Sequence, residues 1–323
     1  MTSTRERQST DRRGGRLPDV VIIGAMKCGT STLHRQLAAD PRFFMSEPKE
    51  PCFFSDDEQW ARGLDWYRGL FASAAPDQRC GESSTHYAKL PTHPRTVDRM
   101  LEVGLSARFV YVVRDPADRL VSQFIHEWSE GRCGRSIERA VRRLPEMLDY
   151  GAYGRQLRPY VDAFGPDRVL VLPFEVMKTD PQLLMAALGR FLEVPNLRWT
   201  DLRADNVSSE RIRRSVFTEA YSGSLVRRAV KAVLPVSAYE RGKRLFQMQG
   251  RPRLSDELRR RAAATLHEDA EVLEHALGVP VRDRPWAEVH ADWVRSARAS
   301  LESETVRSDS AGGIPTVSEP SPG

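Results

Sequence analysis

The segment "DVVIIGAMKCGTST", residues 19–32, constrains the fold more than any other part of the chain. Its apolar run 20–23 predicts a strand that is buried on both faces. Two glycines with four residues between them, Gly24 and Gly29, follow the strand and precede a helical pattern. A strand that passes through a glycine loop into a helix predicts a phosphate-binding loop, because the first amides of the helix point at the ligand.

The lysine of this loop does not occupy the position that ATP- and GTP-binding loops require. Those loops carry lysine directly after the second glycine, where this chain has Thr30, whereas Lys27 lies two residues before that glycine. We also find no clear strand that ends in aspartate, the residue that holds magnesium in those enzymes. The loop therefore predicts a site for a phosphate group without a metal-bound triphosphate. An ordinary strand-to-helix turn is the alternative.

Two further apolar segments, 107–116 and 167–175, predict strands, and helical patterns follow each of them. The last of these helices has Asp180 as its expected N-cap and Pro181 at its first position. Buried strands that alternate with helices predict an α/β fold, a phosphate-loop-type parallel sheet with helices on both faces. Ligands of such sheets bind beyond the carboxyl ends of the strands, where the glycine loop and the later "RDP" motif both lie.

The two ends of the chain differ in composition from its middle. Residues 1–17 and 297–323 are polar and lack periodicity, so we expect them to be disordered, with a single domain over residues 18–296. The apolar runs are too short to span a bilayer, and the N-terminus lacks the apolar core of a secretory signal. These features predict a cytoplasmic protein without a transmembrane segment.

Cysteine spacing and charge narrow the class of ligand. The four cysteines have no paired spacing for zinc or redox chemistry, so we expect free thiols and no bound metal. A net charge of +5, from 49 basic and 44 acidic residues, suits an anionic ligand. The arginines are spread along helices rather than gathered in a stripe with aromatic residues, so a nucleic-acid partner is not expected.

Four motifs resemble those of the sulfotransferases that use 3′-phosphoadenosine 5′-phosphosulfate (PAPS), in the branch with heparan-sulfate-type and many bacterial enzymes. The motifs are "GAMKCGTSTL", "PKEPCFF", "YVVRDPADRLVSQF" and "GRPRLSDELRRR", in the order of the family, over about residues 19–290. The first and third are the most specific. The resemblance implies transfer of a sulfuryl group from PAPS to an acceptor hydroxyl, without a metal.

The resemblance also implies a donor site built from the first, third and fourth motifs. Lys27 would face the bridging oxygen of the phosphosulfate, where preorganised positive charge stabilises the transition state. Arg114 and Ser122 would hold the 3′-phosphate, although Arg114 could instead pair with Asp115 or Asp118. The implied donor-binding residues are Lys27, Cys28, Gly29, Thr30, Ser31, Thr32, Arg114, Ser122, Gly250 and Arg251.

The fourth motif departs from the family pattern. The family commonly has lysine, glycine and arginine in the loop that closes over the 3′-phosphate, and this chain has Gln249 in place of the lysine. Gly250 and Arg251 remain, and Arg253 could supply the missing positive charge. An exposed basic turn before the next helix is the alternative.

In the second motif, Glu50 matches the general base of the family, which would take the proton of the acceptor hydroxyl. Burial beside Phe53 and Phe54 is expected to raise its pKa. The family often has histidine where this chain has Cys52, and Lys49 is a possible electrostatic partner. A glutamate between two prolines could also be an exposed loop charge.

Two histidines are further catalytic candidates. His86, in "CGESSTHYAKLP", follows an expected strand end, and His126 lies one helical turn after Ser122. Either could contact the acceptor, and either could be structural. Heparan-sulfate-type relatives often carry a lysine where this chain has Ser83, so the role of that lysine cannot be transferred.

The sequence therefore predicts in-line sulfuryl transfer to a hydroxyl of a glycan or a small natural product, with Glu50 as base and Lys27 at the leaving phosphate. A phosphate-loop small-molecule kinase is one alternative, and it requires a lysine after Gly29 and magnesium ligands. A non-enzymatic polyanion-binding protein is another, suggested by basic runs such as "RIRRS". No motif identifies the acceptor or the oligomeric state.

Overall fold

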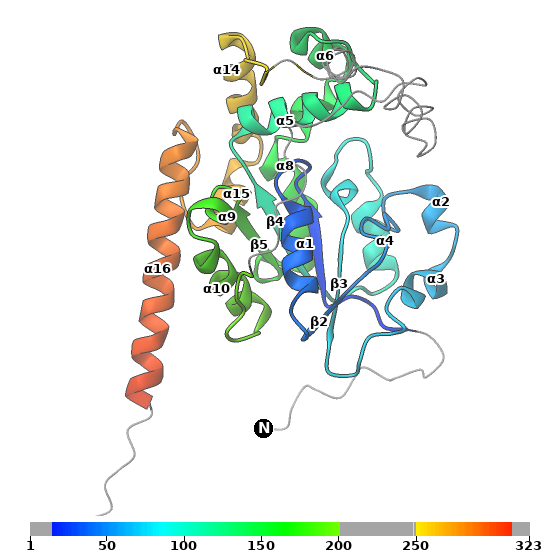
Figure 1. Ribbon diagram of the computed structural model, residues 1–323, viewed down its shortest axis with the longest axis vertical. Helices are drawn as coiled ribbons and strands as arrows, with labels where there is room; N and C mark the ends of the chain where they lie inside the picture. Colours follow the sequence, from blue (N-terminus) through cyan, green and yellow to red (C-terminus); the bar gives the residue numbers. More distant parts are fainter. Residues whose placement is uncertain (1–14, 201–247, 249, 312–323) are drawn as a thin grey trace, which may run out of the picture.

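The computed structural model describes residues 15–200, 248 and 250–311, which form one five-stranded sheet and the helices around it (Figure 1). Every neighbouring pair of strands is parallel, in the order β2-β3-β1-β4-β5. The strands are β1 (Val20–Gly24), β2 (Phe43–Met45), β3 (Arg79–Ser83), β4 (Arg108–Val113) and β5 (Val169–Pro173). The predicted parallel α/β sheet is confirmed.

Helices lie on both faces of the sheet, which explains why all residues of β1 are buried. The α-helices are α1 (Thr30–Ala38), α2 (Asp57–Trp60), α3 (Leu64–Gly69), α4 (Thr96–Glu102), α5 (Pro116–Ser129), α6 (Ile137–Arg143), α7 (Glu146–Asp149), α8 (Tyr153–Phe164), α9 (Val176–Thr179), α10 (Pro181–Leu192), α14 (Asp256–Ala264), α15 (Ala270–Leu277) and α16 (Trp286–Ala311). Short 3₁₀ helices are η1 (Thr85–Ala88), η2 (Pro166–Arg168) and η4 (Thr265–His267).

The sheet changes the direction of its connections at β1. From β1 the chain runs to β2 and β3 on one side, and then crosses to β4 and β5 on the other side. Loops that leave neighbouring strands in opposite directions open a crevice beyond their carboxyl ends. The strand order therefore places the preferred ligand position of this fold at the ends of β1, β3 and β4.

Helix α5 begins where the "RDP" motif leaves β4. The Asp115 side chain accepts a hydrogen bond from the Asp118 amide at 2.8 Å, and Pro116 occupies the first turn. The apolar face of α5 packs with α6, α7 and α14 in a second hydrophobic cluster beside the main core. The helix is thus capped at its start beside β4 and held along its apolar face by this second cluster.

The helix α16 extends beyond the expected domain boundary. It continues through residues 297–311, which the sequence analysis places in a disordered tail, because Ala297 and Leu301 pack against the main core. At the other end, Arg16 donates to the carbonyl of Gln78 at 2.8 Å, so order begins before residue 18. Residues 1–14 and 312–323 lie outside the described residues, and disorder there stays a prediction. No helix of the described chain is long and apolar enough to cross a membrane.

Candidate active site

A pocket of about 810 Å³ opens beyond the carboxyl ends of the strands. Its walls come from the segments that follow β1, β3, β4 and β5, as well as from α5 and the loop before α14. The predicted site residues that line it are Lys27, Gly29, Thr30, Ser31, Thr32, Glu50, His86, Arg114, Ser122, His126, Gly250 and Arg251. The fold therefore brings residues from four separate motifs to one cavity.

The glycine loop holds the start of α1 at this pocket. Gly29 is the N-cap in the left-handed conformation, with φ 85°, and a Cβ there would lie 2.8 Å from the Phe174 ring. No side chain caps α1, and the Thr32 amide donates to the Gly29 carbonyl at 3.0 Å, so the amides of Thr30 and Ser31 are the donors that a ligand can use. Lys27 also has a positive φ of 70°, a conformation that costs free energy for a side chain other than glycine.

Cys28 is the one predicted donor-site residue that does not line the pocket. Its thiol is fully buried, 3.8 Å from the Met26 carbonyl oxygen and 3.9 Å from the Tyr153 hydroxyl. Burial raises the pKa of this thiol to about 12. The side chain therefore belongs to the core.

Arg114 and Arg251 approach the same part of the pocket from distant segments. The Asp118 carboxylate lies 3.4 Å from Nη2 of Arg114 and 2.7 Å from Nη2 of Arg251. The Arg114 guanidinium also lies 4.7 Å from the centre of the Phe174 ring. The ion pair between Arg114 and Asp118, the alternative from the sequence, is thus present. The same Asp118 carboxylate also pairs with Arg251.

The loop before α14 is described only in part. Gly250 and Arg251 line the pocket, whereas Gln249 lies outside the described residues. Arg253 lines a smaller hollow of about 420 Å³, which shares Arg251 with the main pocket. Compensation by Arg253 for the missing lysine therefore stays a prediction.

Glu50 is held in one orientation at the pocket wall. Its backbone has a positive φ of 61°, and its amide donates to the Ser83 carbonyl at 2.9 Å. One carboxylate oxygen lies 2.6 Å from Nζ of Lys49, and the other accepts from the Thr85 hydroxyl at 3.1 Å. Glu50 is thus a fixed part of the cavity rather than an exposed loop charge.

The pKa of Glu50 is lower than usual, which corrects the expectation from the sequence. Burial alone would raise it, but the adjacent Lys49 ammonium, the Lys89 charge and the Thr85 hydroxyl outweigh that effect. The aromatic neighbours alone predict a raised pKa, but the charges of Lys49 and Lys89 act in the opposite direction. A carboxylate that is ionised at neutral pH can accept a proton there.

The two histidines also lie at the pocket, and their roles stay predictions. The His86 ring stacks on His93, with centres 4.6 Å apart, and its Nδ1 is buried without a hydrogen-bond partner in the described structure. Burial, together with the charges of Lys89 and His93, lowers the pKa of His86 to about 4. His86 is therefore neutral at pH 7, and His126 lines the same cavity from α5.

Several pocket residues escaped the sequence analysis. Lys89 is only 8% exposed, and its ammonium lies 5.7 Å from the centre of the Tyr150 ring. Phe174 directly follows β5, so the rule that ligands bind beyond strand ends could have identified it. The further lining residues without a sequence signal are Thr85, Ile125, Arg132, Met177, Lys178, Trp199 and Met248. The described residues include no cluster of acidic, histidine or cysteine side chains suited to a metal ion.

The known proteins that resemble this chain are sulfotransferases. Curated relatives include human bifunctional heparan sulfate N-deacetylase/N-sulfotransferase 1, which is 24% identical over 58% of this chain and 23% of its own length. Another is mouse heparan sulfate glucosamine 3-O-sulfotransferase 5, which is 32% identical over 33% of this chain and 30% of its own length. The chain thus spans less than a third of either relative.

A solved structure and a family model cover more of the chain. The crystal structure of a sulfotransferase from Alicyclobacillus acidocaldarius superimposes with a TM-score of 0.51 and 26% identity, over 70% of this chain and 99% of that one. The family model described as "Sulfotransferase domain" matches residues 17–228, which is more than half of the sequence. The strand order, the converging motifs and this match lead to one conclusion: the chain belongs to the sulfotransferase domain family.

Proposed function

We propose that this protein transfers a sulfuryl group from PAPS to an acceptor hydroxyl. The observation that carries the proposal is the single 810 Å³ pocket, in which the donor motifs and the loop of Glu50 meet. Family membership and the names of the curated relatives support sulfuryl transfer in general. The choice of donor rests on the match of Lys27 and Arg114 to two motifs of the family.

The donor would be held by two groups of residues. The first-turn amides of α1 and the side chain of Lys27 would bind the phosphosulfate, with Lys27 stabilising charge on the leaving phosphate. Arg114, Ser122 and Arg251 would bind the 3′-phosphate, since a guanidinium can form two parallel hydrogen bonds with it. Asp118 would then have to share both arginines with the donor, or release them.

The acceptor would bind beside Glu50. The Glu50 carboxylate would take the proton of the attacking hydroxyl, while Lys49 and Thr85 keep its two oxygens in place. His86 is neutral, so it could exchange a hydrogen bond with the acceptor without adding charge. We propose a glycan or a small natural product as the acceptor, in a cytoplasmic setting. No metal is part of this mechanism.

Donor binding provides the first test. Adenosine 3′,5′-bisphosphate, the product of transfer, should raise the melting temperature, because a ligand of the native state at a hundred times its Kd stabilises by about 2.7 kcal/mol. ATP with magnesium should have a much smaller effect. Equal stabilisation by both ligands would favour the kinase alternative and contradict the PAPS site.

A transfer assay provides the second test. PAPS is incubated with a panel of hydroxylated acceptors that includes sugars, phenols and polyketide-type alcohols, and products are identified by the mass gain of one sulfuryl group. Glu50→Gln is the matched control, because it keeps the size of the side chain and removes the base. A product that forms equally well with the variant would contradict catalysis at Glu50.

A further inference from the structure

A second glutamate, Glu82, is buried directly behind the Glu50 loop. It lies in β3 with 0% exposure and does not line the pocket. One of its carboxylate oxygens accepts from the Tyr67 and Tyr87 hydroxyls, at 2.5 and 2.8 Å. The other oxygen accepts from the Ser84 hydroxyl at 2.8 Å. Three hydroxyl donors thus surround a carboxyl that has no ion pair with the described lysines and arginines.

Two of these hydroxyls also bind the backbone that carries Glu50. The Ser84 hydroxyl accepts from the Cys52 amide at 3.1 Å, and the Tyr87 hydroxyl accepts from the Phe54 amide at 3.5 Å. The Tyr67 hydroxyl, in contrast, is bonded to Glu82 and to no loop amide. Glu82 therefore orients two hydroxyls whose other contacts hold the loop of residues 50–54.

The loop requires such support because its backbone is strained. Glu50 and Cys52 both have a positive φ, 61° and 53°, which side chains other than glycine rarely adopt. Conformations of this kind persist only where the surroundings enforce them. The amides of these residues are held by the β3–η1 segment, through the Ser83 carbonyl and the Ser84 hydroxyl.

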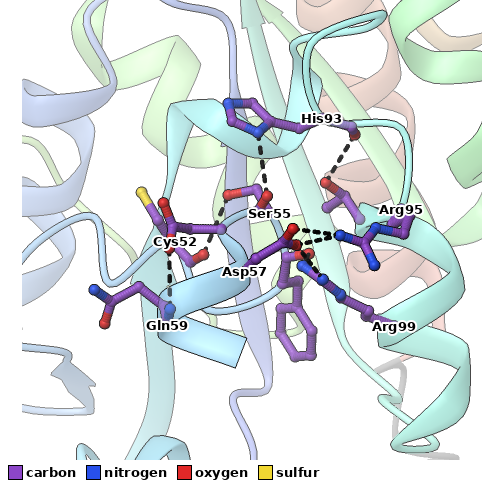
Figure 2. A network of polar contacts seen from close by, with 10 residues as sticks. Cys52, Ser55, Asp57, Gln59, His93, Arg95 and Arg99 are labelled. Carbon is purple, nitrogen blue, oxygen red and sulfur yellow. Dashed lines mark hydrogen bonds and ion pairs between the residues drawn. The ribbon is translucent and has the colours of Figure 1, made fainter. Parts of the chain in front are cut away.

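The far side of the same loop is fixed independently. Arg99 donates to the Phe54 carbonyl at 3.2 Å, and both Arg99 and Arg95 pair with Asp57 (Figure 2). His93 contacts the Ser55 carbonyl at 3.1 Å in the same view. These contacts fix the loop after residue 53, and the Cys52 carbonyl accepts from the Ser55 and Asp56 amides at 3.1 and 3.0 Å. The amides of Glu50 and Cys52 are bonded instead to β3 and to the residue that follows it.

We propose that Glu82 is a positioning residue for Glu50, acting through Ser84 and Tyr87 on the backbone of residues 50–54. This inference rests on the proposed function, in which Glu50 is the catalytic base. A buried carboxylate is costly even when it is hydrogen-bonded, and burial raises the pKa of Glu82 to about 7 despite its hydroxyl partners. In its ionised form this carboxyl can accept from all three hydroxyls at once, which no uncharged side chain of the same size can do.

Glutamine at this position tests that explanation without changing the size of the side chain. With its amide nitrogen toward Ser84, glutamine would donate to a hydroxyl oxygen that already accepts from the Cys52 amide, and Ser84 would lose the acceptor for its own proton. With the nitrogen toward Tyr67 and Tyr87, Tyr87 would lose its acceptor instead. In either orientation one of the two hydroxyls that hold the loop is no longer fixed. Tyr67→Phe is the matched control, because it removes a hydroxyl from Glu82 but none from the loop, and it keeps the aromatic ring.

Hydrogen exchange of the loop amides is the first readout, and it needs no acceptor. In Glu82→Gln, exchange of the Cys52 and Phe54 amides should accelerate about tenfold or more, because the loop opens locally. Tyr67→Phe should leave these amides protected as in the wild type. Unchanged exchange in Glu82→Gln, or equal acceleration in Tyr67→Phe, would overturn the proposal.

Kinetics with an acceptor found in the panel are the second readout. Glu82→Gln and Ser84→Ala should each lower kcat about ten- to a hundredfold, since small displacements of a catalytic group have effects of this size. The double variant should lose no more than Glu82→Gln alone, because the contribution of Ser84 depends on its bond to Glu82. The Kd for adenosine 3′,5′-bisphosphate should remain within about twofold, as should kcat of Tyr67→Phe.

Failure of this inference can be distinguished from failure of the proposed function. A wild-type protein that does not bind the bisphosphate contradicts the PAPS site, whereas the exchange experiment still decides whether Glu82 holds the loop. If Glu82→Gln does not fold, Tyr87→Phe and Ser84→Ala are compared with Tyr67→Phe in both readouts. Parallel losses of kcat and bisphosphate affinity would show a general structural role and would overturn the positioning role.

Discussion

Lys27 and Arg114 are both basic and both line the pocket, but we propose that they meet charge at different stages. Lys27 would meet charge that develops as the sulfuryl group leaves, whereas Arg114 would meet a 3′-phosphate that is charged throughout. Lys27→Ala should therefore lower kcat far more than it weakens bisphosphate binding. Arg114→Ala should mainly weaken donor binding, and its rate should recover partly at high PAPS. Initial rates over a range of PAPS concentrations and calorimetric titration with the bisphosphate give both quantities.

Adenosine 5′-phosphosulfate, a donor without the 3′-phosphate, provides a second way to separate the roles of Lys27 and Arg114. The wild type should strongly prefer PAPS over adenosine 5′-phosphosulfate, because a site built to hydrogen-bond a group rejects the analogue without it. This preference should collapse in Arg114→Ala and persist in Lys27→Ala. If both variants change kcat and binding in the same proportion, the two residues do not have separate roles.

Glu50→Gln should reduce turnover by about two to four orders of magnitude, the range for loss of a general base. The amide can still accept from Thr85, so the loop should keep its conformation. Bisphosphate affinity should be retained, because Glu50 is not proposed to contact the nucleotide. Near-normal turnover in this variant would transfer the role of base to His86 or His126.

The low pKa of Glu50 predicts the acid side of the pH–rate profile. Burial disfavours the ionised form of Glu50, but the adjacent Lys49 charge stabilises it more strongly. The pKa of Glu50 therefore lies below the ordinary glutamate range. Activity that needs this carboxylate should hold as pH falls through the ordinary range and decline only below it. In Lys49→Met the pKa should rise, which moves the decline to higher pH. A profile that does not move in this variant would contradict the assignment of Glu50 as base.

At the scale of elements, the sequence predicted the three strands with long apolar runs, expected a strand end before His86 where β3 ends, and missed β2. β1, β4 and β5 lie in the predicted apolar segments, because helices cover them on both faces. β2 has three residues and β3 reads "RCGES", so neither has an apolar run. β3 is nevertheless buried beside β1, since Glu82 and Ser83 satisfy their polar atoms within the fold. Only the tertiary structure shows those hydrogen bonds.

The start of α10 is a feature that the sequence predicted correctly. The Asp180 side chain accepts from the Leu183 amide at 3.1 Å, with Pro181 at the first turn, and it also pairs with Arg298 at 2.7 Å. Asp180→Ala should lower the free energy of unfolding by about 0.5–2 kcal/mol through loss of the cap. Asp180→Asn retains a cap and loses only a partly exposed ion pair, so it should cost much less. Urea denaturation of both variants measures the difference, and equal costs would assign the effect to the ion pair.

At the scale of the molecule, the motifs predicted which residues meet but not what surrounds them. Twelve of the predicted site residues line one pocket, since every motif except the loop before α14 lies beyond a strand end or on the helix that follows. Thr85 and Lys89 reach Glu50 only because η1 and the residue after it fold back over the sheet. The largest lowering effect on the pKa of Glu50 comes from Lys49, its neighbour in the sequence, and Lys89 and Thr85 add to it. Whether these groups outweigh burial depends on distances in the folded state, so the sequence led to the wrong direction.

The contacts of α16 predict where the folded domain ends. Its first turns bury Trp286, Val289 and Trp293, whereas its later part packs through Ala297 and Leu301 and pairs through Arg298. A chain that ends after residue 296 should lose the second set of contacts. Its melting temperature should fall by several degrees, since about 1 kcal/mol corresponds to 2–4 °C in a domain of this size.

A chain that ends after residue 311 is the matched control, because it keeps the whole helix. It should melt within about one degree of the full chain if residues 312–323 are disordered, as their composition predicts. Both shortened chains should bind the bisphosphate with unchanged affinity, because the residues that line the pocket end at Arg251. If the shorter chain melts like the full one, the later part of α16 does not contribute to the fold in solution, and the domain ends near residue 296. If it loses bisphosphate binding instead, the later part of α16 supports the pocket indirectly, through its contacts with α10.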